Sequence, residues 1–548
     1  MAENQKKLLI QIAIVGFGIL FFIPFLGNVH LFDWDEINFA ESAREMIESG
    51  DYLTVQINFQ PFWQKPPLFI WMQVLSMKIF GVNEFAARFP NAICGIITLL
   101  ILFGIGRKIY DLKFGLLWVL SYAGSILPFF YFKFGIIDPW FNLFIFLGVY
   151  FVIIYNQNQN NKQRLLFVVL SAFALGLGTL TKGPVAFLIW SLTWLVYFIS
   201  KKGKFRIKLS EVAAFVLTLI VIGGTWFLIL IINGNIHVIV DFIEYQIGLF
   251  STASASHDGF FMYHFVILFF GVFPASVFAI NSFKRSPEDN PIQADFRKWM
   301  LYLFWVVLML FSIVKSKIVH YSSLCYFPLT FLCAHYLYHL LKKRTHIRKW
   351  NVIALVTIAI VAGIVIIAVP YTDHFKTTLI ESGLIKHGFI LGNLEADGQW
   401  TGFESLIGIL LVAGIITGTR YLKRKPELGI TCIFATVIIF TYTAYIFVAP
   451  GIERYSQNAA IEFYKKLEST DTYVATLGYK SYAHLFYSKF KPQQHKEYLS
   501  KDWLGNGNID KPAYFSIKIH KSEKYTQRYP KLECLDKKNG FVFCKREP

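Results

Sequence analysis

The chain has 548 residues, of which 55% are hydrophobic, 18% aromatic and only 16% charged. This composition excludes an ordinary soluble enzyme, because so much apolar surface must face lipid. The formal net charge is +18, but the Lys and Arg residues fall in short clusters between apolar stretches, as membrane topology requires. The basic balance therefore indicates a membrane protein and not a nucleic-acid-binding protein.

A bilayer core of about 30 Å requires about 20 apolar residues in a helix, so runs near that length predict membrane spans. The first run follows Lys6 and Lys7 and is not followed by an A-x-A cleavage site, so we expect it to be an uncleaved helix. About thirteen runs meet the criterion. In chain order they are Leu8–Leu26, Arg88–Gly106, Phe114–Phe132, Pro139–Tyr155, Leu165–Leu180, Pro184–Ile199, Val212–Ile232, Tyr263–Ile280, Trp299–Val314, Ile318–Leu341, Trp350–Pro370, Phe403–Tyr421 and Leu428–Ala449.

The orientation of these spans follows from the loops between them. Basic residues in short loops stay on the cytoplasmic side, and here they concentrate in alternate connections, such as Arg107 and Lys108 after the second span. We therefore expect a multi-pass protein of a bacterial inner membrane with a cytoplasmic N-terminus. Residues 1–450 would form a transmembrane catalytic domain with a long periplasmic loop at 27–88, and residues 451–548 a periplasmic domain.

The C-terminal tail is polar and predicts a small soluble domain. Short apolar or alternating runs separated by Gly, Pro, Asn and Lys indicate strands, at Thr472–Leu477, Ala513–Ile519 and Gly540–Cys544. Glu453–Leu467 would be a leading helix. Cys534 and Cys544 are close enough in sequence to form a disulfide in an oxidising compartment. The expected fold is thus an α-helical polytopic membrane protein with a small α/β or α+β domain.

The long loop after the first span carries an acidic group and two predicted helices. Asp33, Asp35 and Glu36 repel one another unless a cation, a moving proton or a polar substrate offsets the cost. Helical spacing from Asp35 to Glu48 predicts an amphipathic helix on the membrane surface, and a second such helix follows Lys65-Pro66-Pro67. Lys65 would lie at headgroup depth, where a cation can hold a lipid phosphate.

Further polar residues are expected on the same outer face. Ionisable groups at membrane depth are costly and are functional candidates by default. These are Asp138 at the start of the fourth span, Lys182 in the turn TLTKGP, His257 and Asp258 in SASHDGFFMYH, and Lys315, Lys317, His320 and Tyr321 in KSKIVHYSSLCYFP.

Carboxylates beside cations suit glycosyl transfer from a phosphate leaving group. Cations stabilise the departing phosphate, and a carboxylate either removes a proton from the acceptor or steadies positive charge at the sugar carbon. The sequence contains neither a G-x-G-x-x-G after a strand nor a P-loop, which disfavours a nucleotide donor. A lipid-linked donor that enters from the bilayer fits the outer face better.

The loop sequence DEINFAESAREMIESGDYLTVQINFQPFWQKPPLFIWMQVLSMKIFGVNEFAARFPNAICG closely resembles the first loop of the aminoarabinose-transferase group. These proteins are relatives of the protein O-mannosyltransferases and have the multi-helical GT-C architecture. IIDPWFNLF, LTKGPVAF, HDGFFMYH and KSKIVHYSSLCYFP are similar to that group in order and spacing. The resemblance covers about residues 1 to 450 and is weak in the tail.

The resemblance implies an inverting transferase that uses a polyprenyl-phosphate sugar. Asp35 matches the group's catalytic aspartate, and Lys65 the lysine that contacts the lipid phosphate; Asp138 matches the aspartate opening the fourth span. Two departures are visible. Gln64 stands where the group often has Glu, which puts a metal site shared with His257 in doubt, and Asn38-Phe39 replaces a frequent Arg-Tyr pair.

The sequence therefore predicts a glycosyltransferase acting from a polyprenyl-phosphate donor on lipid A, another glycolipid or a protein. We expect Asp35, Glu36 and Asp138 to be catalytic, and we assign no metal ligands, although a divalent metal remains an open possibility. The residues expected to bind the donor phosphate or lipid are Lys65, Lys182, His257, Lys315, Lys317, His320 and Tyr321. A polar-lipid flippase and a non-enzymatic scaffold with a sensor tail remain alternatives.

Overall fold

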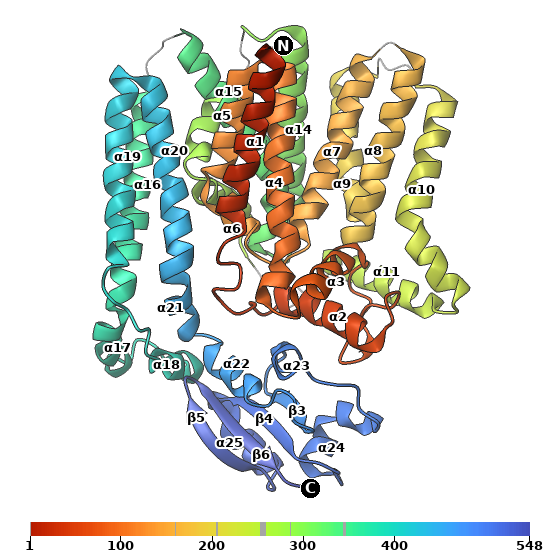
Figure 1. Ribbon diagram of the computed structural model, residues 1–548, viewed down its shortest axis with the longest axis vertical. Helices are drawn as coiled ribbons and strands as arrows, with labels where there is room; N and C mark the ends of the chain where they lie inside the picture. Colours follow the sequence, from red (N-terminus) through yellow and green to blue (C-terminus); the bar gives the residue numbers. More distant parts are fainter. Residues whose placement is uncertain (1, 159, 204–206, 252–258, 285–286, 344–346) are drawn as a thin grey trace.

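The computed structural model shows a bundle of upright helices with a small sheet domain at one end (Figure 1). It describes every residue except 1, 159, 204–206, 252–258, 285–286 and 344–346. The N-terminus lies at the end of the bundle far from the sheet domain, and the C-terminus lies within that domain (Figure 1). The molecule therefore has the two parts that the sequence predicts.

Among the described residues, ten helices are long and apolar enough to cross a membrane. They span enough length because each residue rises about 1.5 Å along a helix. They are α1 (Ala2–Phe22), α4 (Glu84–Ile109), α7 (Asp138–Gln157), α8 (Asn161–Lys182), α10 (Leu209–Ile232), α14 (Pro291–Ile313), α15 (Tyr326–Lys343), α16 (Lys349–Ala368), α19 (Ser405–Arg424) and α20 (Pro426–Thr443).

The other three predicted spans form shorter or broken helices. The run Pro184–Ile199 forms α9 (Val185–Ser200). The expectation of one continuous helix over Phe114–Phe132 is wrong, because the chain breaks between α5 (Leu112–Ala123) and α6 (Ile126–Tyr131). The run Tyr263–Ile280 likewise bends by 107° between α12 (Tyr263–Gly271) and α13 (Ala275–Ala279), where Pro274 cannot continue a helix.

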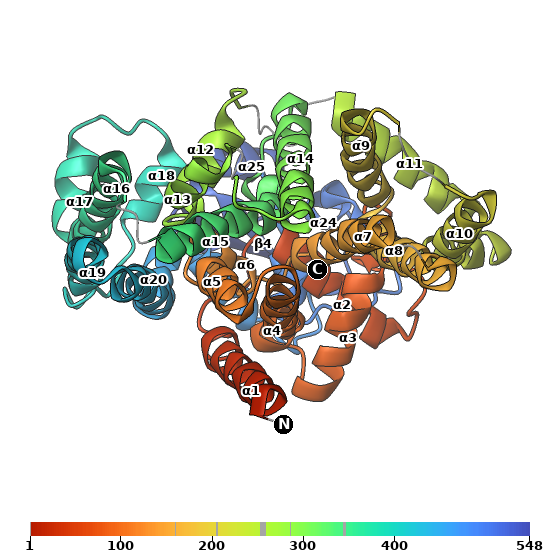
Figure 2. The ribbon, with the colours of Figure 1, turned by 90° about the horizontal axis from the view of Figure 1, so that it is seen from above.

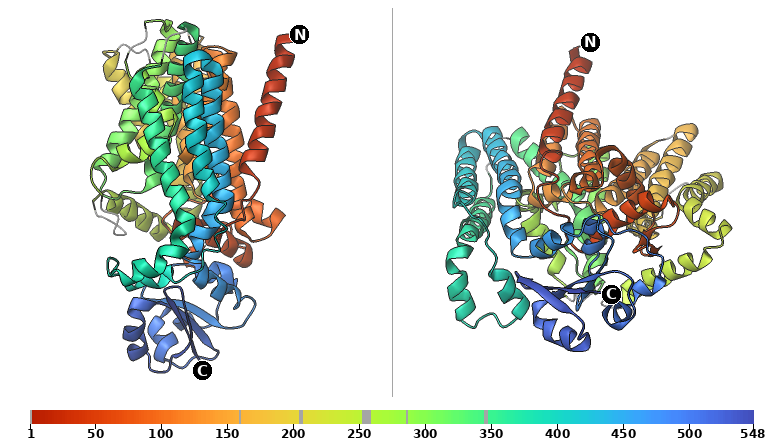
Figure 3. Two further views of the ribbon diagram at one scale, coloured as in Figure 1. Left: turned by 90° about the vertical axis from the view of Figure 1, so that its left-hand side faces the viewer. Right: turned by 60° about the horizontal axis from the view of Figure 1, so that its bottom comes forward.

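The bundle is held by close helix packing and leaves its rim for lipid. An added Cβ at Gly408 of α19 would lie 2.5 Å from the carbonyl oxygen of Gly363 of α16, so only small residues allow this approach. Figures 2 and 3 show α1 at the edge of the bundle. Its Leu9 and Leu20 are exposed, as expected for a helix that faces hydrocarbon.

The long loop forms the two predicted helices, but one of them does not lie where it was expected. It contains α2 (Asp35–Ser49), a short hairpin of β1 (Gln56–Ile57) and β2 (Gln60–Pro61), and α3 (Leu68–Phe80). Both predicted helices are confirmed. However, the expectation that α2 lies on the membrane surface is wrong, because Glu36 to Met46 are all buried. The helix packs against α3 and against α23 (Ala483–Ser488) of the C-terminal domain, so protein covers its polar face.

Smaller helices lie between the bundle and the sheet domain (Figure 1). They are α11 (Ile236–Ser251), α17 (Thr372–Glu381), α18 (Gly388–Leu394) and α21 (Ala449–Arg454). The first three were absent from the sequence prediction, since none resembles a membrane span; the last overlaps the start of the predicted helix Glu453–Leu467.

The C-terminal domain is a four-stranded mixed sheet with short helices. Strand order is β3-β4-β6-β5, with β3 parallel to β4 and the other pairs antiparallel. The predicted strands are confirmed as β3, β4 and β6, whereas the predicted helix Glu453–Leu467 is broken into α21 and α22. The elements are α22 (Asn458–Lys465), β3 (Tyr473–Leu477), α23 (Ala483–Ser488), α24 (Lys501–Asn506), β4 (Ala513–Lys518), α25 (Ser522–Arg528), β5 (Glu533–Lys538) and β6 (Phe541–Arg546).

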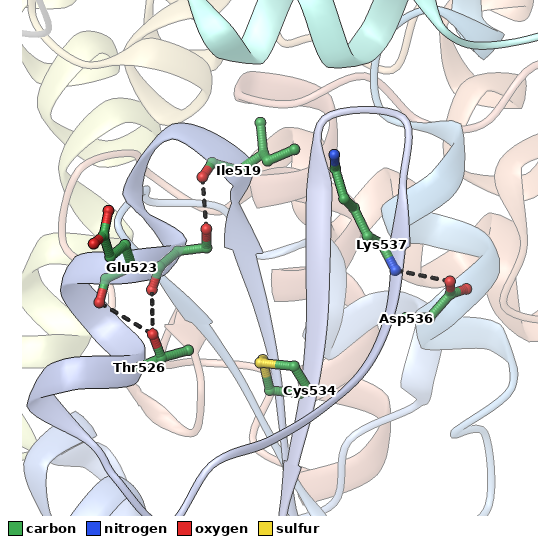
Figure 4. The surroundings of a disulfide bond; sticks show 8 residues. Ile519, Glu523, Thr526, Cys534, Asp536 and Lys537 are labelled. Carbon is green, nitrogen blue, oxygen red and sulfur yellow. Dashed lines mark hydrogen bonds between the residues drawn. A yellow bond between two sulfur atoms is a disulfide. The ribbon is translucent and has the colours of Figure 1, made fainter.

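The expected disulfide forms within this sheet. Cys534 on β5 is paired in register with Cys544 on β6, and the two are covalently linked (Figure 4). All six residues of β5 are exposed, so this edge strand lacks the alternating apolar pattern that a sequence prediction requires. The disulfide therefore links a fully exposed edge strand to the largely buried strand beside it.

Candidate functional site

The candidate site lies where the long loop meets the ends of the membrane helices nearest the sheet domain. Asp35 is the first residue of α2, and Asp138 is the first residue of α7. Lys182 ends α8, and His320 lies in the 3-10 helix Val319–Cys325 before α15. Four segments far apart in the sequence thus bring predicted site residues to one end of the bundle.

These four side chains form a continuous chain of contacts. His320 Nε2 lies 3.3 Å from Asp35 Oδ2 and 3.7 Å from Asp138 Oδ2. Lys182 Nζ donates to Asp138 Oδ1 at 2.6 Å. Within the described part of the chain, the buried Asp138 Oδ2 has no hydrogen-bond partner. A carboxylate oxygen in this state is available to accept from a substrate group.

The charge state of Asp35 follows from its surroundings. Burial by itself raises the pKa of Asp35, but the hydrogen bond and charge of His320, with the fields of Lys65 and Lys182, lower it to about 2. An opposite charge within a few ångströms favours the ionised form of a carboxyl group. Asp35 is therefore a carboxylate throughout the neutral pH range.

Lys65 belongs to the same electrostatic group. Burial and repulsion from Lys182 lower the pKa of Lys65 to about 8, although Asp35 and Asp138 oppose the shift. Mutual effects of this kind require the two lysines and two aspartates to be close together. The loop lysine and the α8 lysine thus provide two cations beside the two carboxylates.

Glu36 has a different environment from the catalytic one expected of it. Its Oε1 accepts from Arg88 Nε at 2.6 Å and from the Gly135 backbone N–H at 2.6 Å. Its Oε2 accepts from Arg88 Nη2 at 2.9 Å and from the Phe32 N–H at 2.8 Å. Both oxygens accept hydrogen bonds from protein groups, so Glu36 fixes the start of α2 in place.

The turn before α15 contributes only some of its predicted residues. The Tyr321 ring lies 5.0 Å from Lys182 Nζ, within cation–π range. Lys317 differs, because its ammonium donates to the carbonyls of Phe311 and Ser312 at the end of α14. Lys315 is exposed. His257 and Asp258 lie outside the described residues.

A buried polar network supports the site and was missed by the sequence prediction. Asn142 Nδ2 donates to Ser323 Oγ at 2.8 Å and to the Tyr131 hydroxyl. Asn142 is one turn after Asp138 on α7, and Ser323 is one turn after His320. This network therefore links α7, one turn after Asp138, to the segment that follows His320. The only sequence signal was the position of Asn142 within the motif IIDPWFNLF.

The C-terminal domain holds the chain that leads to Asp35, which was also not predicted. Gln457 Nε2 donates to the Leu31 carbonyl at 2.9 Å, and its Oε1 accepts from the Asp33 N–H at 3.3 Å. The Tyr487 hydroxyl accepts from the Leu31 N–H at 2.7 Å. Burial raises the pKa of Asp33 to about 6, against a hydrogen bond from Ser481. The domain therefore orders the residues immediately before the candidate carboxylate.

Gln64 is a poor metal ligand where the related proteins often have Glu. An amide oxygen is a weak ligand compared with the carboxylate expected at this position. Within the described ranges, the one group of three or more metal-ligand side chains lies elsewhere, at Asp289, His335 and His339. We therefore derive no chemical step through a metal at Gln64.

A carboxylate and two lysines gather at the end of a bundle of membrane helices, and this combination suits transfer from a phosphate-linked donor. The chain is a polytopic membrane glycosyltransferase with a GT-C-like helix bundle. Residues 64–227 match the family described as Dolichyl-phosphate-mannose-protein mannosyltransferase.

Individual relatives match a longer part of the chain than the family model does. The chain is 24% identical to the undecaprenyl phosphate-alpha-4-amino-4-deoxy-L-arabinose arabinosyl transferase of Pectobacterium carotovorum, over 78% of this chain and 79% of the relative. It is 26% identical to arabinosyl transferase 1 of Proteus mirabilis, over 78% of this chain and 79% of the relative. The chain is thus similar to aminoarabinose transferases over most of its length.

Solved structures show the same fold. The crystal structure of ArnT from Cupriavidus metallidurans bound to undecaprenyl phosphate has a TM-score of 0.77 at 18% identity, covering 97% of each chain. The apo structure of that protein has a TM-score of 0.73 at 17% identity, covering 100% of this chain and 98% of ArnT. The similarity therefore includes the C-terminal domain, where the sequence resemblance is weak.

Proposed function

We propose that this enzyme transfers a sugar from a polyprenyl-phosphate donor to a lipid A-type acceptor at the periplasmic face of the inner membrane. One observation carries the proposal: two carboxylates, a histidine and a lysine from distant segments contact one another at one end of the bundle. These are Asp35, His320, Asp138 and Lys182, and the charge of Lys65 also acts on Asp35. The arabinosyl transferases that resemble this chain support the donor class. The flippase alternative gains no support from these relatives or from polar groups gathered at one end.

Asp35 acts in this proposal as a charge stabiliser. A carboxylate with a pKa of about 2 is a weak base at neutral pH, so proton removal is not its main contribution. As the bond between the sugar carbon and the phosphate oxygen breaks, positive charge develops at that carbon. A buried anion at this position lowers the energy of the transition state.

Lys65 and Lys182 act on the leaving group. The departing polyprenyl phosphate gains negative charge, and two nearby ammonium groups stabilise it. Asp138 holds the Lys182 ammonium at 2.6 Å and leaves one oxygen for a substrate group. An ionised acceptor oxygen, such as that of a lipid phosphate group, then attacks the sugar carbon from the face opposite the donor phosphate. The new carbon–oxygen bond forms as the bond to the donor phosphate oxygen breaks, so no proton is released and the sugar configuration inverts.

The first test is the reaction itself. The purified enzyme in lipid is incubated with undecaprenyl-phosphate sugars and with lipid A or a secreted protein as acceptor, and products are identified by mass spectrometry. We expect a glycosylated lipid and release of undecaprenyl phosphate. If only the protein acceptor were glycosylated, the acceptor would be a protein and not a lipid. If the donor crossed the membrane of vesicles without any product forming, the flippase alternative would be favoured.

The pKa of Lys65 predicts a basic limit to activity. Its ammonium is charged below about pH 8 and neutral above it, so kcat/KM for the donor should fall as the pH rises through 8. Lys65→Arg should remove this fall, because a guanidinium stays charged, whereas Lys65→Met should be weak at every pH. A fall above pH 8 that persists in Lys65→Arg would assign the limit to another group.

The orientation of the chain is tested with reporter fusions. The N-terminus and the sheet domain lie at opposite ends of the bundle (Figure 1). If the N-terminus is cytoplasmic, a reporter placed after Pro450 should therefore be active only outside the cytoplasm. The same reporter placed after Arg424, in a basic connection, should show the opposite behaviour. Equal activity at the two positions would contradict the proposed topology.

A further inference from the structure

Three metal-ligand side chains meet at the end of the bundle opposite the candidate active site. Asp289 precedes α14, and His335 and His339 lie one turn apart on α15. One ligand atom from each residue lies within 4.8 Å of the other two. His335 is fifteen positions beyond His320, which is about 22 Å along the chain at helical rise. This cluster is therefore separate from the site around Asp35.

The distances from the two histidines to Asp289 are close to those between ligand atoms of a tetrahedral ion. His335 Nε2 lies 3.1 Å from each oxygen of Asp289, and His339 Nε2 lies 3.1 Å from Asp289 Oδ1. Ligand atoms at about 2.0–2.1 Å from a tetrahedral zinc ion are about 3.3–3.4 Å from one another. An ion could thus be held with small movements of these side chains.

The outer nitrogens of the two rings are also engaged. His335 Nδ1 is 2.8 Å from Ser282 Oγ, and His339 Nδ1 is 3.0 Å from Glu288 Oε2. Metal-binding histidines characteristically donate their second ring N–H to such a partner. Both ring nitrogens of His339 face carboxylates, but a neutral imidazole carries only one N–H. The carboxylate that faces Nε2 therefore needs either a second proton on the ring or a bound cation between the two groups.

The cluster is mostly buried, although the His339 side chain is 13% exposed. The Asp289 side chain is fully buried and that of His335 is 4% exposed. Arg297 Nε lies 3.4 Å from Asp289 Oδ2, and its Nη1 donates to the carbonyls of Ser282 and Lys284. Lys343 pairs with Glu288. These two cations offset the two carboxylates and hold the ligand-bearing segments in position.

We propose that Asp289, His335 and His339 bind a divalent transition-metal ion such as Zn²⁺. Two imidazoles and a carboxylate suit zinc and its neighbours in the first transition series rather than Mg²⁺ or Ca²⁺. The ion would join the segment before α14 to α15 at the N-terminal end of the bundle. It takes no part in glycosyl transfer, because it lies at the far end of the membrane helices.

Metal binding is measured on the purified full-length protein in detergent, treated with a chelator and then titrated with Zn²⁺. We expect one ion per chain by elemental mass spectrometry, and at least tenfold weaker binding in His339→Gln. Asp289→Asn serves as a second ligand variant in case His339→Gln does not fold. Glu288→Gln should weaken binding about 10–100-fold, since it orients His339.

Two controls separate this cluster from other histidines. His374→Gln removes an exposed histidine of α17, and His257→Gln removes the loop histidine near the expected donor side; both should bind Zn²⁺ as the wild type does. Loss of the ion in His257→Gln with retention in His339→Gln would overturn the proposal. The proposal would also be overturned if the chelator-treated wild type bound no Zn²⁺. In that case a doubly protonated His339 would be the remaining explanation of its two carboxylate contacts.

Discussion

Asp35→Asn is expected to reduce glycosyl transfer by about 1,000-fold while the protein still inserts, folds and binds donor. The amide has nearly the same shape as the carboxylate but lacks the negative charge that steadies the sugar carbon, and removal of one transition-state contact costs about 10²–10³ in kcat. His320 would keep a hydrogen-bond acceptor at 3.3 Å. The measurement is kcat for release of undecaprenyl phosphate, with the melting temperature recorded in parallel.

Glu48→Gln is the matched control for this variant. Glu48 lies on the same helix as Asp35 but is exposed, so loss of its charge should leave kcat within about twofold. Asp138→Asn should raise KM as well as lower kcat, because Lys182 would lose its ionic partner. Full activity in Asp35→Asn would remove Asp35 from the chemistry and with it the central assignment.

Glu36→Gln is expected to destabilise the protein strongly rather than only to inactivate it. Arg88 is fully buried and Glu36 is 3% exposed, with Nε and Oε1 2.6 Å apart. Arg88 also donates to the carbonyls of Leu26, Val29 and His30. Breaking a buried ion pair leaves an uncompensated charge and costs about 3–5 kcal/mol, so thermal unfolding in detergent should occur at a clearly lower temperature.

The exposed pair Lys113–Glu427 provides the comparison. Its side chains are 47% and 72% exposed, and exposed pairs contribute about 0–1 kcal/mol, so Glu427→Gln should melt as the wild type does. If Glu36→Gln kept the wild-type melting temperature but lost activity, the catalytic role first expected of Glu36 would be restored.

The C-terminal domain gains a role from the same reasoning. Gln457 and Tyr487 hold Leu31 and Asp33, four and two residues before Asp35. The Trp34 ring lies 5.8 Å from that of Tyr482. The tail therefore keeps the start of α2 in one position, which a charge-stabilising carboxylate requires because small displacements weaken catalysis sharply.

Much of the fold could be predicted because its signals are local. The thirteen apolar runs correspond to helices, and α3 begins directly after Pro66-Pro67. Hydropathy and proline positions act over a few residues, so they are legible without any knowledge of packing. The break at Gly124 and the exposed strand β5 were not predicted, because neither a bend within an apolar run nor a polar edge strand changes the hydrophobic pattern. The break at Pro274 was also missed, although the proline was a local signal for it.

For the candidate site, the sequence by itself determined which residue types gather on one face, through the loop motif around Asp35 and Lys65 and the turn that carries His320. Only the tertiary structure decided their roles. Asp35 meets His320 whereas its neighbour Glu36 meets Arg88, fifty-two positions away. Such choices depend on which buried charge can reach which partner across the folded chain, and long-range packing sets that geometry.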